Sequence, residues 1–241
     1  MNQAVDRRLF DRRLFTTAAI ALPLIVLAGF GRTYYLKGLF DVPPLPSRLV
    51  HLHGLLMTAW VALFVTQVWL ISSKQVRLHR RLGYSGIGLG VLIVAVGFVT
   101  ALRSAKYGSV STPPDVPPLA FLAVPLFDLL LFAVLFGGAI YYRRQAAEHK
   151  RLMLLTAIGL LAPAVARIPI APLQALGPLW FFGVPTVVAS LCVGLDWRRH
   201  GRVNTVFLVG TVVLILSFVV RLVVMGTDAW LRLAGWLTAL V

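Results

Sequence analysis

The sequence predicts an all-α, polytopic membrane protein, a bundle of seven transmembrane helices in a single domain over residues 1–241. The first observation is composition: 59% of the residues are hydrophobic and only 13% are charged, too apolar for one soluble core. The second is a series of apolar stretches of roughly 18 to 25 residues, each able to cross about 30 Å of hydrocarbon. The third is that basic residues gather at alternate helix ends.

Seven apolar segments define the expected helices, because backbone groups in lipid must be satisfied within the segment itself. In chain order they are 14–34, 49–72, 82–102, 118–142, 151–170, 178–196 and 204–224. The tail 227–241 repeats apolar residues at roughly helical spacing but is too short to span comfortably. We therefore expect it to form an interfacial helix.

The formal net charge of +15 is read here as a topology signal, so no nucleic-acid partner is expected. Fifteen of the 23 basic residues fall on one side of the seven predicted helices. They are Arg7, Arg8, Arg12, Arg13, Lys74, Arg77, Arg80, Arg81, Arg143, Arg144, Lys150, Arg151, Arg198, Arg199 and Arg202. This bias predicts a multi-pass protein of the bacterial cytoplasmic (inner) membrane, with a cytoplasmic N-terminus and the C-terminus outside.

The third predicted helix carries glycines along one face. Gly83, Gly86, Gly90 and Gly97 form a small-residue pattern that lets helix backbones approach closely. We interpret this face as a packing seam. No strand precedes the glycines, which argues against a phosphate-binding loop.

A few polar residues lie deep in the apolar segments, where they are costly. Asp128 falls near the bilayer centre, and a carboxylate there is either neutral or paired with a cation. Arg167 and Arg221 fall near the outer ends of the fifth and seventh helices. One hypothesis is an outward-opening polar pocket around Asp128, for a transporter or sensor. The alternatives are a buried structural ion pair and, for each arginine, snorkelling to the headgroups.

Two histidines open the second helix in the stretch HLHG. On a helix His51 and His53 project about 200° apart, so they cannot share one metal ion. His53 continues at helical spacing to Trp60 and Gln67, the only deep amide of this helix. We therefore expect His53 to face the bundle and to join the pocket together with Gln67.

A second group of histidines lies at the predicted cytoplasmic helix starts. LHRRLG (78–83) and EHKRLM (148–153) share one residue order, and RRHGR brings His200 to the next start. Two neutral imidazoles from different helices, His79 and His149, could hold a haem iron, with nearby basic residues on the propionates. The same residues could equally belong to the positive-inside signal.

The HLHG and LHRRLG elements resemble ascorbate-reducible b-type cytochromes, in which a helix opening with His leads through a basic loop to a second His. The resemblance covers roughly residues 50–90 and implies His79 as a haem ligand and His53 as a possible second-site ligand. That family pairs histidines on both sides of the membrane, whereas the outer histidines here share one helix. It therefore implies at most one haem, between His79 and His149. HLHG, LHRRLG and HKRLM are also similar to uncharacterised bacterial integral membrane proteins.

Three function classes stay open at this point. They are a redox-type protein with one b-type haem or a quinone, a small-molecule transporter or sensor, and an accessory or assembly subunit of a larger membrane complex. The sequence contains no nucleophilic triad, HExxH, P-loop or carboxylate dyad. It therefore predicts neither catalytic residues nor a metal site.

Overall fold

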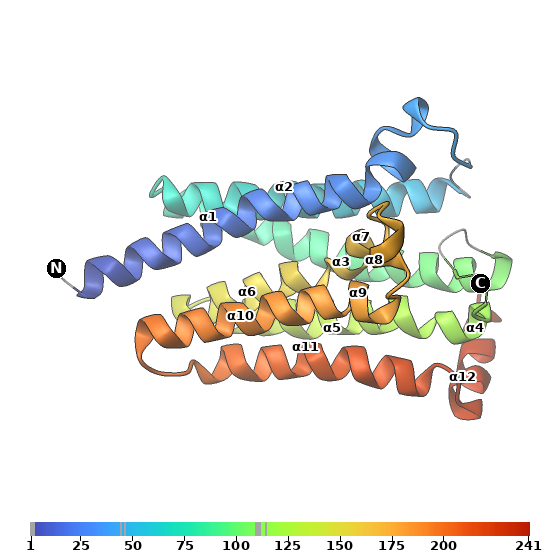
Figure 1. Ribbon diagram of the computed structural model, residues 1–241. Helices are drawn as coiled ribbons and strands as arrows, with labels where there is room; N and C mark the ends of the chain where they lie inside the picture. The colour runs from blue at the N-terminus through green and yellow to red at the C-terminus, as the bar shows by residue number, and fades with distance from the viewer. Residues whose placement is uncertain (1–2, 44, 46, 109–111, 114) are drawn as a thin grey trace.

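The computed structural model describes residues 3–43, 45, 47–108, 112–113 and 115–241, with side chains from Leu9 onward. Within these residues the chain forms helices and no strand, so the all-α prediction is confirmed. Seven segments are long and apolar enough to cross a membrane, as predicted. The chain runs up and down the bundle. Its first helix begins at one end, and the C-terminus lies at the other end (Figure 1).

The helices differ widely in length. The long ones are α1 (Gln3–Phe30), α2 (Arg48–Ser72), α3 (Val76–Tyr107), α5 (Ala123–Tyr141), α6 (Ala146–Gly159), α10 (Gly183–His200) and α11 (Thr205–Val224). The short ones are η1 (Gly31–Tyr35), η2 (Lys37–Leu39), α4 (Pro118–Phe121), α7 (Ala162–Ala166), α8 (Ala171–Gln174), α9 (Pro178–Phe181) and α12 (Asp228–Thr238). We call the end with turns 73–75, 142–145 and 201–204 the basic end, and the other the C-terminal end.

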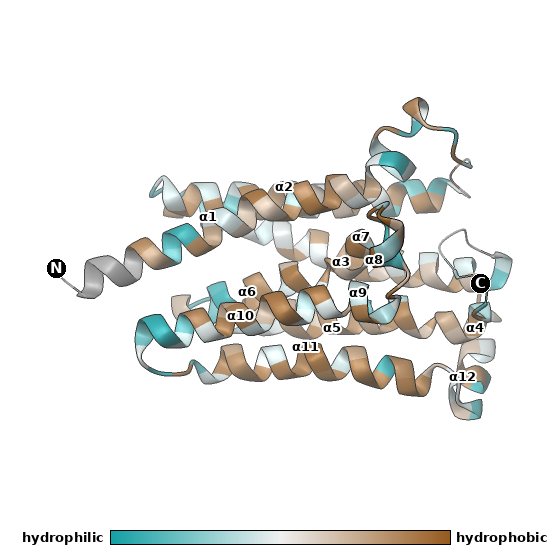
Figure 2. Ribbon diagram, in the orientation of Figure 1, coloured by the Kyte–Doolittle hydropathy of each residue, from teal (hydrophilic) through white to brown (hydrophobic). Residues whose placement is uncertain are grey.

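Hydrophobic residues cover the middle of the bundle, and hydrophilic residues gather towards its ends (Figure 2). The third helix is longer than the predicted 82–102, because the polar stretch 76–81 is already helical. This extension matters for the site, since it puts His79 inside the first turn of α3 rather than in a loop.

The fifth crossing differs from the predicted helix 151–170. It consists of α6 and α7, and the helix ends at Ala166. Pro163 explains the break, because proline lacks an N–H and is tolerated in the first turn of a helix but not in its interior. The chain then turns through α8 and α9 before α10 begins.

The fifth crossing is also the centre of the bundle. In its most apolar window 67% of the residues are buried, against 17–39% in the other six crossings. α6 packs against α5, α11, α10 and α1. A helix enclosed on all sides needs its polar groups matched inside the protein, and α6 begins with Glu148, His149, Lys150 and Arg151.

The glycine face of α3 is a packing seam, as predicted. A Cβ at Gly86 would lie 3.0 Å from Leu63 of α2, and one at Gly90 would overlap the Phe136 ring of α5. At Gly97 a Cβ would lie 2.8 Å from Leu129. The missing side chains therefore let α3 approach α2 and α5 closely.

The expected tail helix is present as α12, which lies across the C-terminal end of the bundle (Figure 1). Its Trp230 and Ala234 are buried in a small cluster with α3 and α4 residues, and the Trp230 Nε1 donates to the Leu119 carbonyl at 2.9 Å. The Lys106 ammonium donates to Val241, the last residue of the chain. Packing and hydrogen bonds thus hold the tail to the bundle.

Candidate functional site

Asp128 and Arg221 form an ion pair between α5 and α11. The Arg221 side chain is fully buried, so each of its donors needs an acceptor from the protein. Besides Asp128, it donates to the Ser217 carbonyl at 3.1 Å, the Ser217 hydroxyl at 2.9 Å and the Val124 carbonyl at 3.3 Å. The two contacts with Ser217 lie within α11, because Ser217 is one helical turn before Arg221.

Aromatic rings enclose the same guanidinium. Its central carbon lies 5.1 Å from the Phe182 ring centre and 5.0 Å from that of Phe218. Cation–π contacts of this kind strengthen when water is excluded. Hydrogen bonds and rings together satisfy Arg221, which favours the structural ion-pair reading of Asp128 over a binding pocket.

His53 faces inward from α2, as predicted. Its Cε1 would lie 3.6 Å from a Cβ at Gly97 of α3, and Arg167 is close enough to interact with it electrostatically. His51, by contrast, is exposed, and its ring lies 3.3 Å from the Tyr34 hydroxyl. The two imidazoles of HLHG therefore have separate environments.

Gln67 does not join the other residues predicted for the outer pocket. Arg167 lies at the end of α7, near His53, where it donates to the Pro163 carbonyl at 2.7 Å and lies 4.8 Å from the centre of the Phe30 ring. Gln67 lies 14 residues after His53 on α2, about 21 Å along the helix axis. It therefore belongs to the basic end rather than to a pocket with His53.

The basic end brings His79 and His149 together. His79 comes from the first turn of α3 and His149 from the first turn of α6. Their ring centres are 6.4 Å apart and the ring planes are inclined by 80°. Both helices start at the same end of the bundle because α2 and α3, like α5 and α6, are joined by short turns there (Figure 1).

The two imidazoles differ in their hydrogen bonds. The His149 Nδ1 donates to the Ala139 carbonyl at 2.8 Å, which leaves a lone pair on Nε2 of the neutral ring. The His79 ring interacts with the backbone carbonyl of Gln67, and its Nδ1 is buried without a hydrogen-bond partner. Metal-bound histidines are usually anchored through the second ring nitrogen, as His149 is.

The haem expectation can be tested against these nitrogens. Two histidines on opposite sides of one iron would have their ring centres about 6 Å apart, given metal–nitrogen bonds of about 2 Å. The observed separation fits this spacing. The unpartnered nitrogen of His79, Nδ1, does not suit a haem ligand, because it adjoins the ring carbon that bears Cβ. A flat porphyrin around a metal bound at Nδ1 would collide with Cβ. The pair therefore suits a metal ion better than a haem.

A second polar cluster, which the sequence analysis missed, lies at the same end between α1, α6 and α10. The buried Arg151 and Asp196 form a bidentate pair with four nitrogen–oxygen contacts of 2.7–3.2 Å. His200 is the last residue of α10, and its Nδ1 donates to the Asp196 carbonyl at 2.9 Å. The i, i+4 spacing of Asp196 and His200 was the available signal.

This cluster borders a cavity of about 360 Å³. Oxygen and nitrogen atoms of Asp11, Asp196 and His200 lie within 4.8 Å of one another, a spacing that a metal ion could bridge. Both carboxylates already have cationic partners, since Lys150 lies 2.5 Å from Asp11 and Arg151 forms a salt bridge with Asp196. We therefore interpret the cluster as a structural network.

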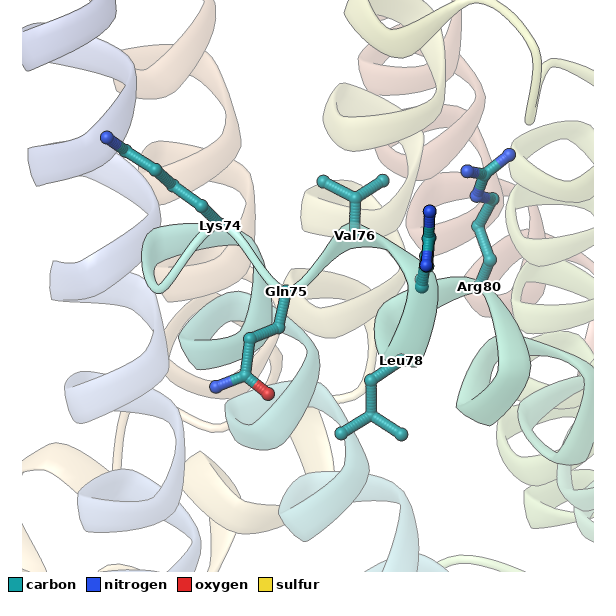
Figure 3. A pocket seen from close by; sticks show the side chains of 6 residues that line it. Lys74, Gln75, Val76, Leu78 and Arg80 are labelled. Atoms are coloured by element: carbon teal, nitrogen blue, oxygen red, sulfur yellow. The ribbon is translucent and has the colours of Figure 1, made fainter.

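A larger surface pocket of about 540 Å³ lies at the turn between α2 and α3. It is lined by Lys74, Gln75, Val76, Arg77, Leu78 and Arg80. Figure 3 shows that the Lys74 side chain points away from Arg80, which lies on the other side of the pocket, so these two cations do not converge on one ligand.

Comparison of the chain with protein-family models, curated proteins and solved structures found no match. Function has to be inferred from the site itself.

Proposed function

We propose that this chain is a redox-type membrane protein in which His79 and His149 hold one metal-centred redox group. The observation that carries the proposal is the pair itself: two imidazoles from different helices have ring centres 6.4 Å apart. His149 is anchored by a backbone carbonyl, and His79 has a buried nitrogen without a hydrogen-bond partner. Neutral imidazole is the commonest protein ligand for redox-active metals, and an anchored second nitrogen orients the ring and raises its basicity.

The resemblance to ascorbate-reducible b-type cytochromes supports an electron-transfer role for His79. A haem remains the form that the resemblance implies, whereas the free nitrogen of His79 favours a bare ion. The alternative function, a transporter or sensor around Asp128, has less support because Arg221 already binds the carboxylate. A role as a subunit of a larger membrane complex is compatible with a redox centre.

The experiment is an absorption spectrum with metal analysis on the purified full-length protein. We expect about one metal per chain, lost in His79→Ala and in His149→Ala. His200→Ala is the matched control, because this histidine lies at the same end but is bound to Asp196, and it should keep the metal. A wild-type protein with neither bound metal nor visible absorption would refute the proposal.

We also propose that the basic end is cytoplasmic, that the C-terminal end is outside the bacterial inner membrane, and that α12 lies at the outer interface. The positive-inside bias supports this orientation. Single cysteines at two exposed positions, Arg144→Cys and Tyr107→Cys, would test it in a Cys192→Ser background. With intact cells whose outer membrane is permeabilised, a membrane-impermeant maleimide should label only Tyr107→Cys. The reverse pattern would invert the orientation.

A further inference from the structure

The described residues contain five buried side-chain atoms that lack a hydrogen-bond partner. They are His53 Nδ1, Trp60 Nε1, Gln67 Oε1, His79 Nδ1 and Thr211 Oγ1. Buried polar atoms are nearly always partnered, so each exception calls for an explanation such as a bound ion. Two of the five, on Gln67 and His79, belong to the site that the proposed function uses.

The atoms at this site are electron-pair donors. The His149 Nε2 carries a lone pair in the neutral ring, because its Nδ1 carries the proton and donates it to a carbonyl. The His79 Nδ1 is buried without a partner and can present a lone pair in the neutral ring. The Gln67 Oε1 is an acceptor by its chemistry. Its amide nitrogen would lie 3.9 Å from a Cβ at Gly83, one turn from His79 on α3. A metal cation accepts electron pairs and could therefore be the common partner of these atoms.

The ring separation restricts the coordination geometry. With metal–nitrogen bonds of about 2 Å, two imidazoles on opposite sides of one ion have ring centres about 6 Å apart, and at a tetrahedral angle about 5 Å. The observed 6.4 Å matches the opposed arrangement. Copper(I) accepts two opposed nitrogen ligands, whereas structural zinc sites require four ligands at tetrahedral angles.

Charge points to the same ion. All three candidate ligands are neutral, and Arg80 acts on His79 electrostatically. Of the acidic groups at this end, Asp11 and Asp196 are bound by Lys150 and Arg151, and Glu148 accepts from the Asn204 amide at 3.4 Å. A singly charged ion is less disfavoured than a doubly charged one in such a basic setting. Copper also binds nitrogen ligands most tightly of the first-row divalent series, so the site would still hold the ion after oxidation.

We propose that the protein binds one copper(I) ion through His79 Nδ1 and His149 Nε2, with the Gln67 side-chain oxygen as a weaker third ligand. This inference rests on the proposed function, because it names the metal-centred group at the same histidine pair. It also assigns Gln67 to this site, and it replaces haem by a bare ion.

The test uses the full-length protein in detergent, titrated with copper(I) alone against a chromogenic copper(I) chelator under anaerobic conditions. The wild type should bind one ion. His79→Ala and His149→Ala should lose at least 100-fold in affinity, and Gln67→Leu about 10-fold. His200→Ala should match the wild type. X-ray absorption on the wild-type complex should show two short copper–nitrogen bonds, which keeps the test valid if a variant fails to fold.

The outcomes separate the two proposals. A haem with two histidine ligands, lost in His79→Ala and His149→Ala, would overturn the copper site and leave the proposed function standing. Tight zinc binding with four ligands would also overturn it. Copper that stays bound in the double variant His79→Ala/His149→Ala would show that the ion lies elsewhere. Binding of neither copper nor haem would refute both proposals.

Discussion

Two buried polar groups at opposite parts of the bundle have contrasting surroundings. At Asp128 and Arg221 the ion pair, the Ser217 contacts and two phenylalanine rings satisfy the charge completely. At His79 and Gln67 two buried atoms have no partner. Polar groups in a membrane helix are costly, so a satisfied group serves packing, whereas an unsatisfied one indicates a place for a ligand. Changes that remove single partners test this contrast.

The largest effect is expected from Arg221→Leu. This change leaves the Asp128 carboxylate buried without its counter-charge, which should destabilise the fold by about 3–5 kcal/mol. The double variant Arg221→Leu/Asp128→Leu should recover most of this loss, because no charge is then left unpaired. The measurement is denaturant unfolding of the purified protein in detergent. A single-variant cost below about 1 kcal/mol would place Arg221 among exposed, snorkelling arginines.

The opposite result is expected at the other site. His79→Leu removes an imidazole whose Nδ1 has no partner and whose ring interacts with the Gln67 carbonyl, so the cost should be about 1 kcal/mol in the metal-free protein. The same unfolding assay measures it. A loss as large as that of Arg221→Leu would mean that the histidine pair holds the bundle together rather than a ligand.

A smaller effect than that of Arg221→Leu is expected from Arg151→Leu. Asp196 loses its bidentate partner but keeps the His200 Nδ1 at 3.3 Å, so its carboxylate is not left without a polar contact. The cost should therefore lie near the lower limit for a broken buried pair, about 3 kcal/mol. Lys150→Leu is the matched control on the same helix. Its pair with Asp11 is partly exposed, so the loss should stay below about 1 kcal/mol. Equal losses would contradict the distinction.

Sequence reasoning predicted the seven crossings because each needs only length and hydrophobicity. It also predicted that His79 and His149 lie near each other, since both open helices at the same end of the bundle. The break of the fifth helix at Leu160 and Leu161 was missed, because a proline inside an apolar run is compatible with either a kink or a new helix.

The partners of the polar residues were harder to predict. Arg167 and Arg221 lie at similar depths in their predicted helices. Only the three-dimensional structure shows that Arg221 forms the ion pair with Asp128. Arg151 was counted with the topology signal, although the position of α6 at the bundle centre buries it against Asp196. No sequence pattern shows that the His79 Nδ1 lies buried without a hydrogen-bond partner, because this depends on how α3 packs.

A close approach along the α3 seam gives the next effect. Gly90→Ala would push a methyl group into the Phe136 ring, which should cost about 1–3 kcal/mol through overpacking. Gly88→Ala is the matched control, because no atom lies within 4 Å of the added Cβ. There the higher helix propensity of alanine should stabilise α3 by up to about 1 kcal/mol. Thermal unfolding of both variants measures the difference, and equal shifts would rule out a packing role for this face.

The smallest effect is expected from two threonines, and its sign is the informative part. Thr211 of α11 and Thr156 of α6 are both buried, at 4% and 1% exposure. The Thr156 hydroxyl donates to the Leu152 carbonyl at 2.8 Å, whereas the Thr211 hydroxyl has no partner.

Valine has nearly the same shape as threonine and lacks the hydroxyl. Thr156→Val should therefore cost about 1 kcal/mol, and Thr211→Val should stabilise the protein by about the same amount, because it removes an unsatisfied polar group. Thermal unfolding of the two variants in one detergent gives both signs. If Thr211→Val destabilises the fold as Thr156→Val does, the Thr211 hydroxyl has a partner such as a bound water. The same explanation would then have to be considered for the Gln67 oxygen and the His79 nitrogen before an ion is assigned to them.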